Sequence, residues 1–320
     1  MHNYLITGGA GFIGSYLAER LLHEGHKITV VDDLSTGRWS NIAHLESDPD
    51  FRAVVASADD VKLMGDEIPR HSFIFHLASA VGVQLVVDRP VETVQRIVRT
   101  TDVIVELAAR FRRPVLLTST SEVYGKSEAI PFSEDADTVM GPTSKRRWAY
   151  ACAKALDEFL MLAHYRQTSL PVYIARLFNT VGPRQSGSYG MVLPRFIDAA
   201  LKGEAISVFG SGEQSRCFCS VHDIIDGLVA LSRCPAAVGN VVNLGSDEEI
   251  TVWQLAQRVV RLTGSHSPIV RVPYEKAYGP GFDDMMRRIP DLRRARDLIG
   301  WNPAYRLDDI IRQIIADRTR

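Results

Sequence analysis

The sequence predicts an α/β fold, a doubly wound parallel sheet followed by a smaller, loop-rich C-terminal lobe. Three observations support this prediction. Short apolar runs alternate with helical periodicity in the first half, the first run ends in closely spaced glycines, and Gly, Pro and Ser interrupt the second half. Strands separated by helices of this length join through right-handed crossovers, which makes neighbouring strands parallel.

Each strand and helix of the first half has its own signal. Six short apolar runs have the character of buried parallel strands, and they span 4–6, 27–31, 51–56, 73–77, 115–118 and 172–177. Apolar residues recur at helical spacing between them, as Leu17, Leu21 and Leu22 do, and predict helices over 12–24, 91–111 and 150–165.

The second half has a different character. Gly, Pro and Ser are concentrated in 179–188 and 210–215, and four prolines interrupt 268–290. Helical periodicity returns at 191–201, 221–231, 252–262 and 307–316. We therefore expect a smaller lobe over the carboxyl edge of the sheet, with a ligand in the crevice between the two parts.

Composition and charge exclude several classes of partner. Lys and Arg number 37 and Asp and Glu 38, a formal net charge of -1, so we expect neither a nucleic acid nor a membrane surface as partner. No apolar run approaches the ~18 residues that span a bilayer, and the N-terminus lacks a signal-peptide pattern, so we expect a cytoplasmic protein. The four cysteines form no C-x-x-C pair. We expect reduced thiols and no metal site, with Cys217 and Cys219 on one face of a strand.

A glycine-rich turn is the sharpest local signal. Gly8, Gly11 and Gly14 follow the first strand and open the first helix. In such a turn the first glycine permits tight bending, the second a close approach to a pyrophosphate, and the third packing of the helix on the strand. Asp32 ends the second strand, where an acid that binds a ribose hydroxyl belongs and a 2′-phosphate is disfavoured. The motif predicts a Rossmann-like fold that binds NAD rather than NADP.

A tyrosine and a lysine stand at catalytic spacing. Tyr150 and Lys154 are four residues apart, on one face of a predicted helix. An ammonium close to a phenol favours the phenolate and lowers the pKa of the tyrosine. Such a tyrosine can take a proton from a sugar hydroxyl while a hydride leaves for nicotinamide. Ser119 and Thr120 follow the fifth strand, at the same sheet edge as the glycine turn, which supports a catalytic role for the pair.

These residues give the chain its resemblance to the extended short-chain dehydrogenase/reductases that act on nucleotide sugars. The resemblance covers essentially the whole chain. Its motifs are Thr7-Gly8-Gly9-Ala10-Gly11-Phe12-Ile13-Gly14, His76-Leu77-Ala78, Ser119-Thr120-Ser121-Glu122-Val123-Tyr124-Gly125, Tyr150 with Lys154, Asn179 with Gly182-Pro183-Arg184, and Gly300-Trp301-Asn302-Pro303. It implies an NAD that is reduced and reoxidised within one turnover, with Thr120, Tyr150 and Lys154 as the catalytic trio. It also implies a homodimer that pairs the helices 91–111 and 149–165 into a four-helix bundle.

The resemblance also implies the division of the chain and the cofactor site. We expect an NAD-binding Rossmann domain over 1–178 with a later return near 217–246, and a nucleotide-sugar-binding lobe over 179–216 and 247–320. The expected cofactor-binding residues are Gly8, Gly11, Phe12, Ile13, Gly14, Asp32, Asp33, Ser35, Thr36, Gly37, Leu77, Ala78, Ser79, Tyr150 and Lys154.

Two positions depart from the family pattern. Ile97 stands where a helix usually carries an Asn near the cofactor, and Ser57 stands where an acid usually contacts adenine. Both departures weaken expected cofactor contacts and leave the core glycine motif intact.

The reaction depends on the fate of the ketone that oxidation creates at C4 of the sugar. A carboxylate at C5 can leave as CO₂, a C5 proton can be removed with dehydration at C6, or the returning hydride can invert C4. Glu122 lies two residues past Thr120 and is expected to reach the sugar near C5. The Ser-Thr-Ser-Glu sequence is similar to UDP-glucuronate decarboxylases and to GDP-mannose 4,6-dehydratases. Residues 141–150 and 278–290 resemble the decarboxylase domain of the aminoarabinose-lipid pathway.

The resemblance further places the substrate on the second half of the chain. The expected substrate-binding residues are Asn179, Arg195, Phe209, Arg216 and Arg288. Arginines suit a dianionic diphosphate and a C5 carboxylate. We predict first a UDP-glucuronate decarboxylase, second a 4-epimerase acting on UDP-glucuronate or UDP-glucose, and third a 4,6-dehydratase. A non-catalytic NAD-sensing scaffold is the alternative outside the enzymes, and the intact trio argues against it.

Overall fold

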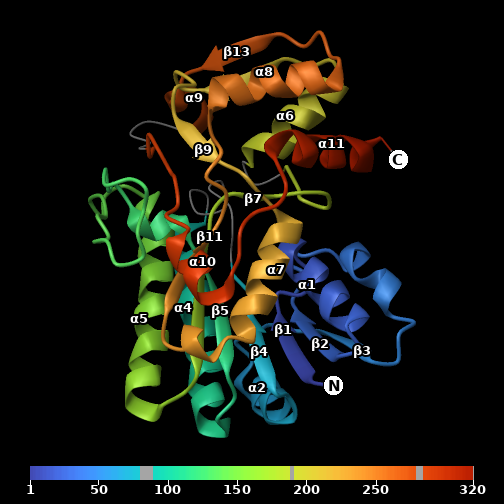
Figure 1. The fold of residues 1–320 in the computed structure, drawn as a ribbon, viewed down its shortest axis with the longest axis vertical. Coiled ribbons are helices and arrows are strands. Elements are labelled where there is room, and N and C mark those ends of the chain that lie inside the picture. The colour runs from blue at the N-terminus through green and yellow to red at the C-terminus, as the bar shows by residue number, and fades with distance from the viewer. Residues whose placement is uncertain (80–88, 188–190, 279–283, 320) are drawn as a thin grey trace.

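The structure, a computed structural model, describes residues 1–79, 89–187, 191–278 and 284–319 of the chain. Its centre is a seven-stranded sheet in the order β11-β6-β5-β4-β1-β2-β3, in which all neighbouring strands are parallel (Figure 1). The strands are β1 (Asn3–Thr7), β2 (Lys27–Asp32), β3 (Phe51–Val55), β4 (Phe73–His76), β5 (Val115–Thr120), β6 (Val172–Leu177) and β11 (Val241–Leu244). The strand order reverses between β1 and β4, which opens a crevice at the carboxyl ends of these two strands.

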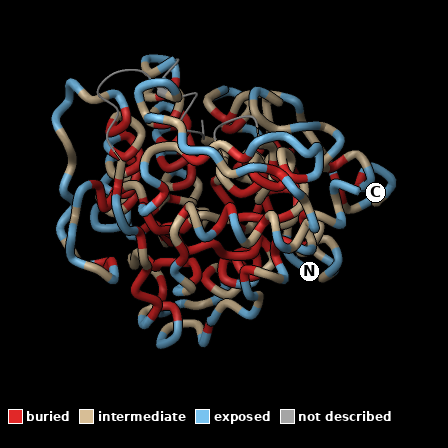
Figure 2. Tube along the Cα trace, turned by 90° about the horizontal axis from the view of Figure 1, so that it is seen from above, coloured by how far each residue is buried: buried red, intermediate tan, exposed pale blue. Residues whose placement is uncertain are grey.

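Helices cover both faces of the sheet, because successive residues of a strand point to opposite sides. Ile6 and Val30 pack into the core of one face, and Leu5 and Val31 into the core of the other. The helices of the first face are α1 (Phe12–His23), α7 (Val221–Ser232) and α10 (Arg293–Ile299). The helices of the second are α2 (Val61–Glu67), α4 (Pro90–Phe111) and α5 (Trp148–Thr168). Buried residues accordingly fill the interior in Figure 2, with exposed residues around them.

A second core lies in the C-terminal lobe, at the top of Figure 1. Its helices are α6 (Val192–Leu201), α8 (Val252–Thr263), α9 (Tyr274–Tyr278) and α11 (Leu307–Arg318). This half of the chain also contains short two-stranded sheets. They pair β8 (Ile206–Phe209) with β13 (Ile269–Val272), β9 (Ser215–Cys217) with β12 (Glu249–Thr251), and β7 (Thr180–Val181) with β10 (Cys219–Ser220). Apolar side chains such as Phe196, Leu255 and Ile311 fill the space between α6, α8 and α11.

The predicted fold class is confirmed, and each predicted strand and helix has a counterpart within a few residues. The short helices α2 and α10 lie outside the predicted set, since seven residues carry too little periodicity to be recognised. The prediction that Cys217 and Cys219 share a strand is wrong, because Cys217 ends β9 and Cys219 begins β10. Both thiols are buried. In the described part of the chain, no helix is both long and apolar enough to cross a membrane. The proposed domain boundaries stay a prediction.

The motif around Trp301 has a structural role that links the two parts of the chain. The Trp301 indole nitrogen donates to the carbonyl oxygen of Asp223 at 2.8 Å. The Asp223 carboxylate accepts from the backbone N–H groups of Ala304 at 2.9 Å and Tyr305 at 3.1 Å. Asp223 is 2% exposed, so water cannot readily replace it as the partner of these two donors.

Replacement of Asp223 by Ala is therefore expected to lower the free energy of unfolding by about 2–3 kcal/mol, because two backbone donors lose their acceptor. Urea unfolding followed by circular dichroism measures this loss. Asp226→Ala is the matched control on α7, since Asp226 is half exposed and pairs with surface Arg20. Asp226→Ala is expected to change the free energy of unfolding by less than about 1 kcal/mol. Equal costs for the two variants would contradict the assigned role of Asp223.

Candidate active site

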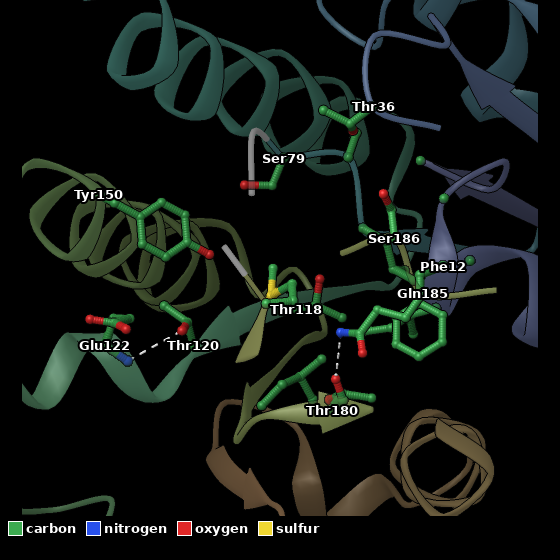
Figure 3. A pocket seen from close by; sticks show the side chains of 18 of the residues that line it. Phe12, Thr36, Ser79, Thr118, Thr120, Glu122, Tyr150, Thr180, Gln185 and Ser186 are labelled. Atoms are coloured by element: carbon green, nitrogen blue, oxygen red, sulfur yellow. Dashed lines mark hydrogen bonds between the residues drawn. The ribbon is translucent and has the colours of Figure 1, made fainter. Parts of the chain in front are cut away.

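A cavity of 480 Å³ opens at the carboxyl edge of the sheet. Its walls come from the turns after β1, β2, β4 and β5, from the start of α5, and from the C-terminal lobe. Sites for small molecules commonly measure about 300–1,000 Å³. Figure 3 shows Tyr150, Thr120 and Glu122 together at one side of this cavity, with Phe12 and Gln185 at the other.

The cavity brings together most of the residues that the sequence predicted. Those predicted for the cofactor are Gly8, Gly11, Phe12, Ile13, Gly14, Asp32, Asp33, Ser35, Thr36, Leu77, Ala78 and Ser79. Those predicted for catalysis and substrate are Thr120, Glu122, Tyr150, Asn179, Arg195, Phe209, Arg216 and Arg288. Gly37 and Lys154 are outside its wall. A Cβ on Gly37 would come within 2.8 Å of Asp32 Oδ1, and Lys154 is only 2% exposed.

Two positions of the glycine turn have no room for a side chain. Gly8 has a φ of 74°, and a Cβ there would lie 2.7 Å from the backbone nitrogen of Ala78. A Cβ on Gly14 would lie 2.3 Å from the carbonyl oxygen of Gly8, so α1 can begin over the turn only with glycine at this position. Within the described residues no side chain caps the N-terminus of α1. Its first N–H groups are thus suited to phosphate oxygens.

Asp32 is fixed at the end of β2 by two backbone donors. Its carboxylate accepts from the N–H of Ala10 at 3.0 Å and of Leu34 at 2.8 Å. Burial is the main cause that raises its pKa from the usual value, and these two hydrogen bonds oppose the rise. Nearby, the Arg96 guanidinium contacts Asp33 and donates to Ser35 Oγ at 2.7 Å. Asp33 therefore neutralises the arginine that stands next to this part of the cavity.

The two departures from the family pattern have different surroundings. Ile97 is 1% exposed and packs with Ala153 beneath Tyr150, so it supports the tyrosine through apolar contact. Ser57 lines the cavity beside Ala56 and Ala58. A hydroxyl thus replaces the expected acid without closing the cavity.

Tyr150 and Thr120 meet where β5 ends and α5 begins. Burial raises the pKa of Tyr150 above its usual value, and the negative charge of Glu122 raises it further. A hydrogen bond from Thr120 and the charge of Arg288 oppose the rise. The sequence predicted the opposite direction from the neighbouring Lys154. In the structure the Lys154 ammonium pairs with Asp157, with Nζ 2.9 Å from Oδ2.

Glu122 is held between two arginines. Its carboxylate lies 2.7 Å from the Arg288 guanidinium and 3.2 Å from that of Arg147. Burial alone would raise its pKa, but the charges of Arg147, Arg288 and Arg216 lower it to about 2. Glu122 is therefore ionised at neutral pH.

A second carboxylate stands beside this group. Asp284 lies 2.9 Å from the Arg216 guanidinium and 3.2 Å from that of Arg147, and the Tyr274 hydroxyl donates to it at 2.9 Å. With Glu122 and Arg288, the group holds three arginines and two carboxylates. It has a surplus positive charge, which suits an anionic ligand.

The remaining predicted substrate residues lie in the lobe wall. The Arg195 guanidinium lies 4.0 Å from the centre of the Phe209 ring, a cation–π contact. The Asn179 amide donates to the carbonyl oxygen of Cys217 at 2.8 Å, which ties the end of β6 to β9. Asn179 thus positions this wall as well as lining it.

Three residues of the charged group were not among the predicted site residues: Arg147, Asp284 and Tyr274. Arg147 stands three residues before Tyr150, and this spacing was an available signal, since it places both on the same side of the start of α5. Asp284 lies in the stretch 278–290 that carries the decarboxylase resemblance, whereas Tyr274 carried no comparable signal, because its stretch lacks periodicity. Of the stretch 278–290, residues 279–283 lie outside the described residues.

Comparisons with known proteins identify the family of the chain. The sequence matches the family described as GDP-mannose 4,6 dehydratase over residues 5–314. It is 40% identical to a UDP-N-acetyl-alpha-D-glucosaminuronate decarboxylase of Bacillus cytotoxicus, over 93% of this chain and 92% of that protein. It is 37% identical to UDP-glucuronic acid decarboxylase 1 of Danio rerio, over 97% of this chain and 71% of that protein.

A solved structure supports the same relationship. The fold matches that of UDP-glucose 4-epimerase of Thermotoga maritima, solved with UDP-glucose, with a TM-score of 0.88 and 27% identity over 99% of this chain and 98% of that one. Together with the sequence matches, this confirms the predicted family: the chain belongs to the GDP-mannose 4,6-dehydratase-like extended short-chain dehydrogenases/reductases.

Proposed function

We propose that the chain is an NAD-dependent decarboxylase of a UDP-linked uronic acid, with UDP-glucuronate as the first candidate substrate. The observation that carries the proposal is the ionised Glu122, held by Arg147 and Arg288 beside Thr120 and Tyr150. A decarboxylase has to bind a substrate carboxylate and also promote its departure. The relatives from Bacillus cytotoxicus and Danio rerio are named for this reaction on two UDP-uronates.

The residues of the first half fit NAD. The glycine turn can form because Gly8 and Gly14 lack a Cβ that would clash with neighbouring backbone, and the α1 N-terminus offers N–H groups to a pyrophosphate. Asp32 is placed to accept from a ribose hydroxyl. When bound, NAD supplies a site that accepts a hydride from C4 of the sugar and can return it.

Tyr150 is the proposed acid–base group. As the phenolate, it would accept the proton of the C4 hydroxyl while the hydride leaves C4 for NAD, which leaves a ketone at C4. Thr120 hydrogen-bonds to Tyr150 and so orients its hydroxyl. The proposed catalytic residues are Thr120, Tyr150, Lys154 and Glu122.

The ketone then allows loss of CO₂. The bond from C5 to the carboxylate breaks, its electron pair moves into the C4 carbonyl, and CO₂ leaves as a neutral molecule. The resulting enolate takes a proton at C5 from solvent water. The negative charge of Glu122 raises the energy of the nearby substrate carboxylate, and departure of CO₂ relieves this repulsion. The surplus positive charge of Arg147, Arg216 and Arg288 offsets the repulsion during binding.

A 4-epimerase is the second candidate, since the Thermotoga maritima structure of that name shares the fold over nearly the whole chain. A 4,6-dehydratase is the third, since the matching family is described by that activity. Incubation with UDP-glucuronate and with its 2-acetamido analogue, followed by NMR of the products, separates these candidates. A pentose nucleotide or its 4-keto form with CO₂ supports the proposal, whereas inversion at C4 with the carboxylate retained contradicts it.

We also propose a cytoplasmic homodimer, formed through α4 and α5. Leu156 is 50% exposed and Phe159 is 68% exposed on α5, so this face presents two large apolar side chains. Sedimentation equilibrium tests the dimer, and Phe159→Glu is expected to shift it toward monomer. A wild-type chain that sediments as a monomer would contradict it.

Asp32 is expected to make the chain bind NAD far better than NADP, because its carboxylate repels a 2′-phosphate. Arg96 is expected to attract a 2′-phosphate only weakly, because its guanidinium already pairs with Asp33. Asp32→Ala is expected to narrow the ratio of the two dissociation constants by about tenfold or more. Calorimetric titration with each cofactor measures the ratio. Asp59→Ala, on a carboxylate that pairs with exposed Arg99, is the control. Equal affinities of the wild type for both cofactors would contradict the assignment.

A further inference from the structure

The buried carboxylate of Asp157 stands next to the proposed catalytic residues and has no role in the function described above. Tyr150, Lys154 and Asp157 are spaced at i, i+4 and i+7, so they share one face of α5. Lys154 Nζ lies 2.9 Å from Asp157 Oδ2, and the two side chains are 2% and 0% exposed. A lysine this deeply buried needs a partner of opposite charge to stay protonated.

A chain of neutral polar side chains leads away from the pair through α4, β4 and β1. Burial raises the pKa of Asp157, and Lys154 and, more weakly, Thr101 of α4 lower it. The Thr101 hydroxyl lies 3.1 Å from His76 Nε2, and His76 Nδ1 lies 2.8 Å from the Thr7 hydroxyl. Burial and the Lys154 charge lower the pKa of His76 to about 3, so its ring is neutral.

This chain of contacts reaches the cofactor wall. The Thr7 hydroxyl accepts from the backbone N–H of Ala78 at 3.3 Å, and Ala78 lines the cavity. Asp157 therefore provides the negative charge that faces Lys154 from within a network joining α5, α4, β4 and β1.

We propose that Asp157 is a positioning residue: it holds the Lys154 ammonium within α5 and weakens the pull of that charge on the Tyr150 proton. The inference rests on the assignment of Tyr150 and Lys154 under the proposed function. Asp157 and Glu122 both raise the pKa of Tyr150, and Arg288 lowers it. Glu158, which also faces Asp157, is engaged by Arg176 at 2.7 Å. A phenol set in this way keeps its proton more firmly, so its phenolate is the stronger base toward the proton of the C4 hydroxyl.

The test is direct titration of the Tyr150 phenol, which requires no substrate. The chain has ten tyrosines, so the ultraviolet phenolate signal of Tyr150 is obtained as the difference between each protein and its Tyr150→Phe counterpart. The titrations are made on the NAD complex. Asp157→Asn removes the charge and keeps an acceptor for Lys154. It is expected to lower the titration midpoint by about 1–2 pH units, the scale of one nearby charge.

Two further variants separate charge from packing. Thr101→Val removes a neutral neighbour of the same cluster and is expected to leave the midpoint unchanged. Asp157→Glu keeps the charge and is expected to stay near the wild-type midpoint. If Asp157→Asn does not fold, Asp157→Ser takes its place, with the same expected direction. The proposal is overturned if Asp157→Asn leaves the titration midpoint of Tyr150 unchanged or raises it. It is also overturned if Thr101→Val lowers the midpoint as much as Asp157→Asn does. Because turnover is not measured, a wrong substrate would leave this result intact.

Discussion

Replacement of Tyr150 by Phe is expected to lower turnover of UDP-glucuronate by about 10²–10⁴-fold, the usual effect of losing a positioned acid–base group. The substitution removes only the hydroxyl that accepts the C4 proton. Ile97 and Ala153 pack beneath the ring and are expected to hold the Phe ring in the same place. The measurement is steady-state product formation by NMR, with NAD affinity determined separately by titration.

The control for this variant is Tyr165→Phe, the same substitution near the other end of α5. Tyr165 is 36% exposed and does not line the described cavity. Turnover of the control is expected within about twofold of wild type, since it loses no group near the reacting atoms. Near-normal turnover of Tyr150→Phe would remove Tyr150 from the mechanism. A loss of NAD binding in that variant would instead indicate a structural role.

Local patterns predicted the first half of the fold well, and the physical reason is that its signals are short in sequence. A buried parallel strand is largely apolar along its length, as 27–31 and 115–118 are, and a glycine turn must follow β1 directly. Gly8, Gly14 and Asp32 could therefore be placed at the carboxyl edge of the sheet without knowledge of any distant contact.

The charged group around Glu122 could not be assembled in the same way, because tertiary contacts create it. Arg288 is brought to Glu122 by a short backbone pairing in which Phe132 N–H donates to Ile289 O at 2.8 Å and Asp291 N–H donates to Phe132 O at 3.0 Å. Neither segment has strand periodicity, so sequence reasoning placed Arg288 only by resemblance. The ion pair between Arg288 and Glu122 could be recognised only in the structure.

The pKa of Tyr150 shows a different kind of limit. The i, i+4 spacing to Lys154 was read correctly, and the i, i+3 spacing from Lys154 to Asp157 was equally visible in the sequence. What the sequence did not reveal is burial. The Asp157 carboxylate, with a side chain 0% exposed, pairs with the Lys154 ammonium. Burial and the charge of Glu122 then raise the pKa of Tyr150.

Replacement of Glu122 by Gln is expected to separate sugar oxidation from loss of CO₂. The variant keeps the shape of the side chain and removes the negative charge. Without this charge, Arg147 and Arg288 stabilise the ground-state carboxylate of the substrate, and its departure loses the relief of repulsion. CO₂ release is expected to fall by about 10²–10³-fold, the scale of one electrostatic contact to the reacting group. The initial oxidation at C4 is expected to persist, because Thr120 and Tyr150 are unchanged.

The pKa of Glu122 sharpens this expectation. Its value of about 2 lies below the usual value, so the carboxylate is ionised above that pH and would be protonated only in strong acid. Wild-type CO₂ release is therefore expected to show no acid limb from Glu122 between about pH 4 and 8. Its stabilising effect on the folded state is present above its unfolded value and is lost as pH falls toward 2.

Stopped-flow absorbance of transient NADH, recorded beside CO₂ release and product NMR, provides the measurement. In Glu122→Gln, NADH is expected to accumulate while CO₂ lags. Glu128→Gln is the matched control, since Glu128 is an exposed acid six residues further along that does not line the described cavity. In an epimerase Glu122 touches no bond that breaks, so C4 inversion would survive its replacement. Equal loss of oxidation and CO₂ release in Glu122→Gln would contradict a role specific to decarboxylation, because it would show that the charge is needed before the ketone forms.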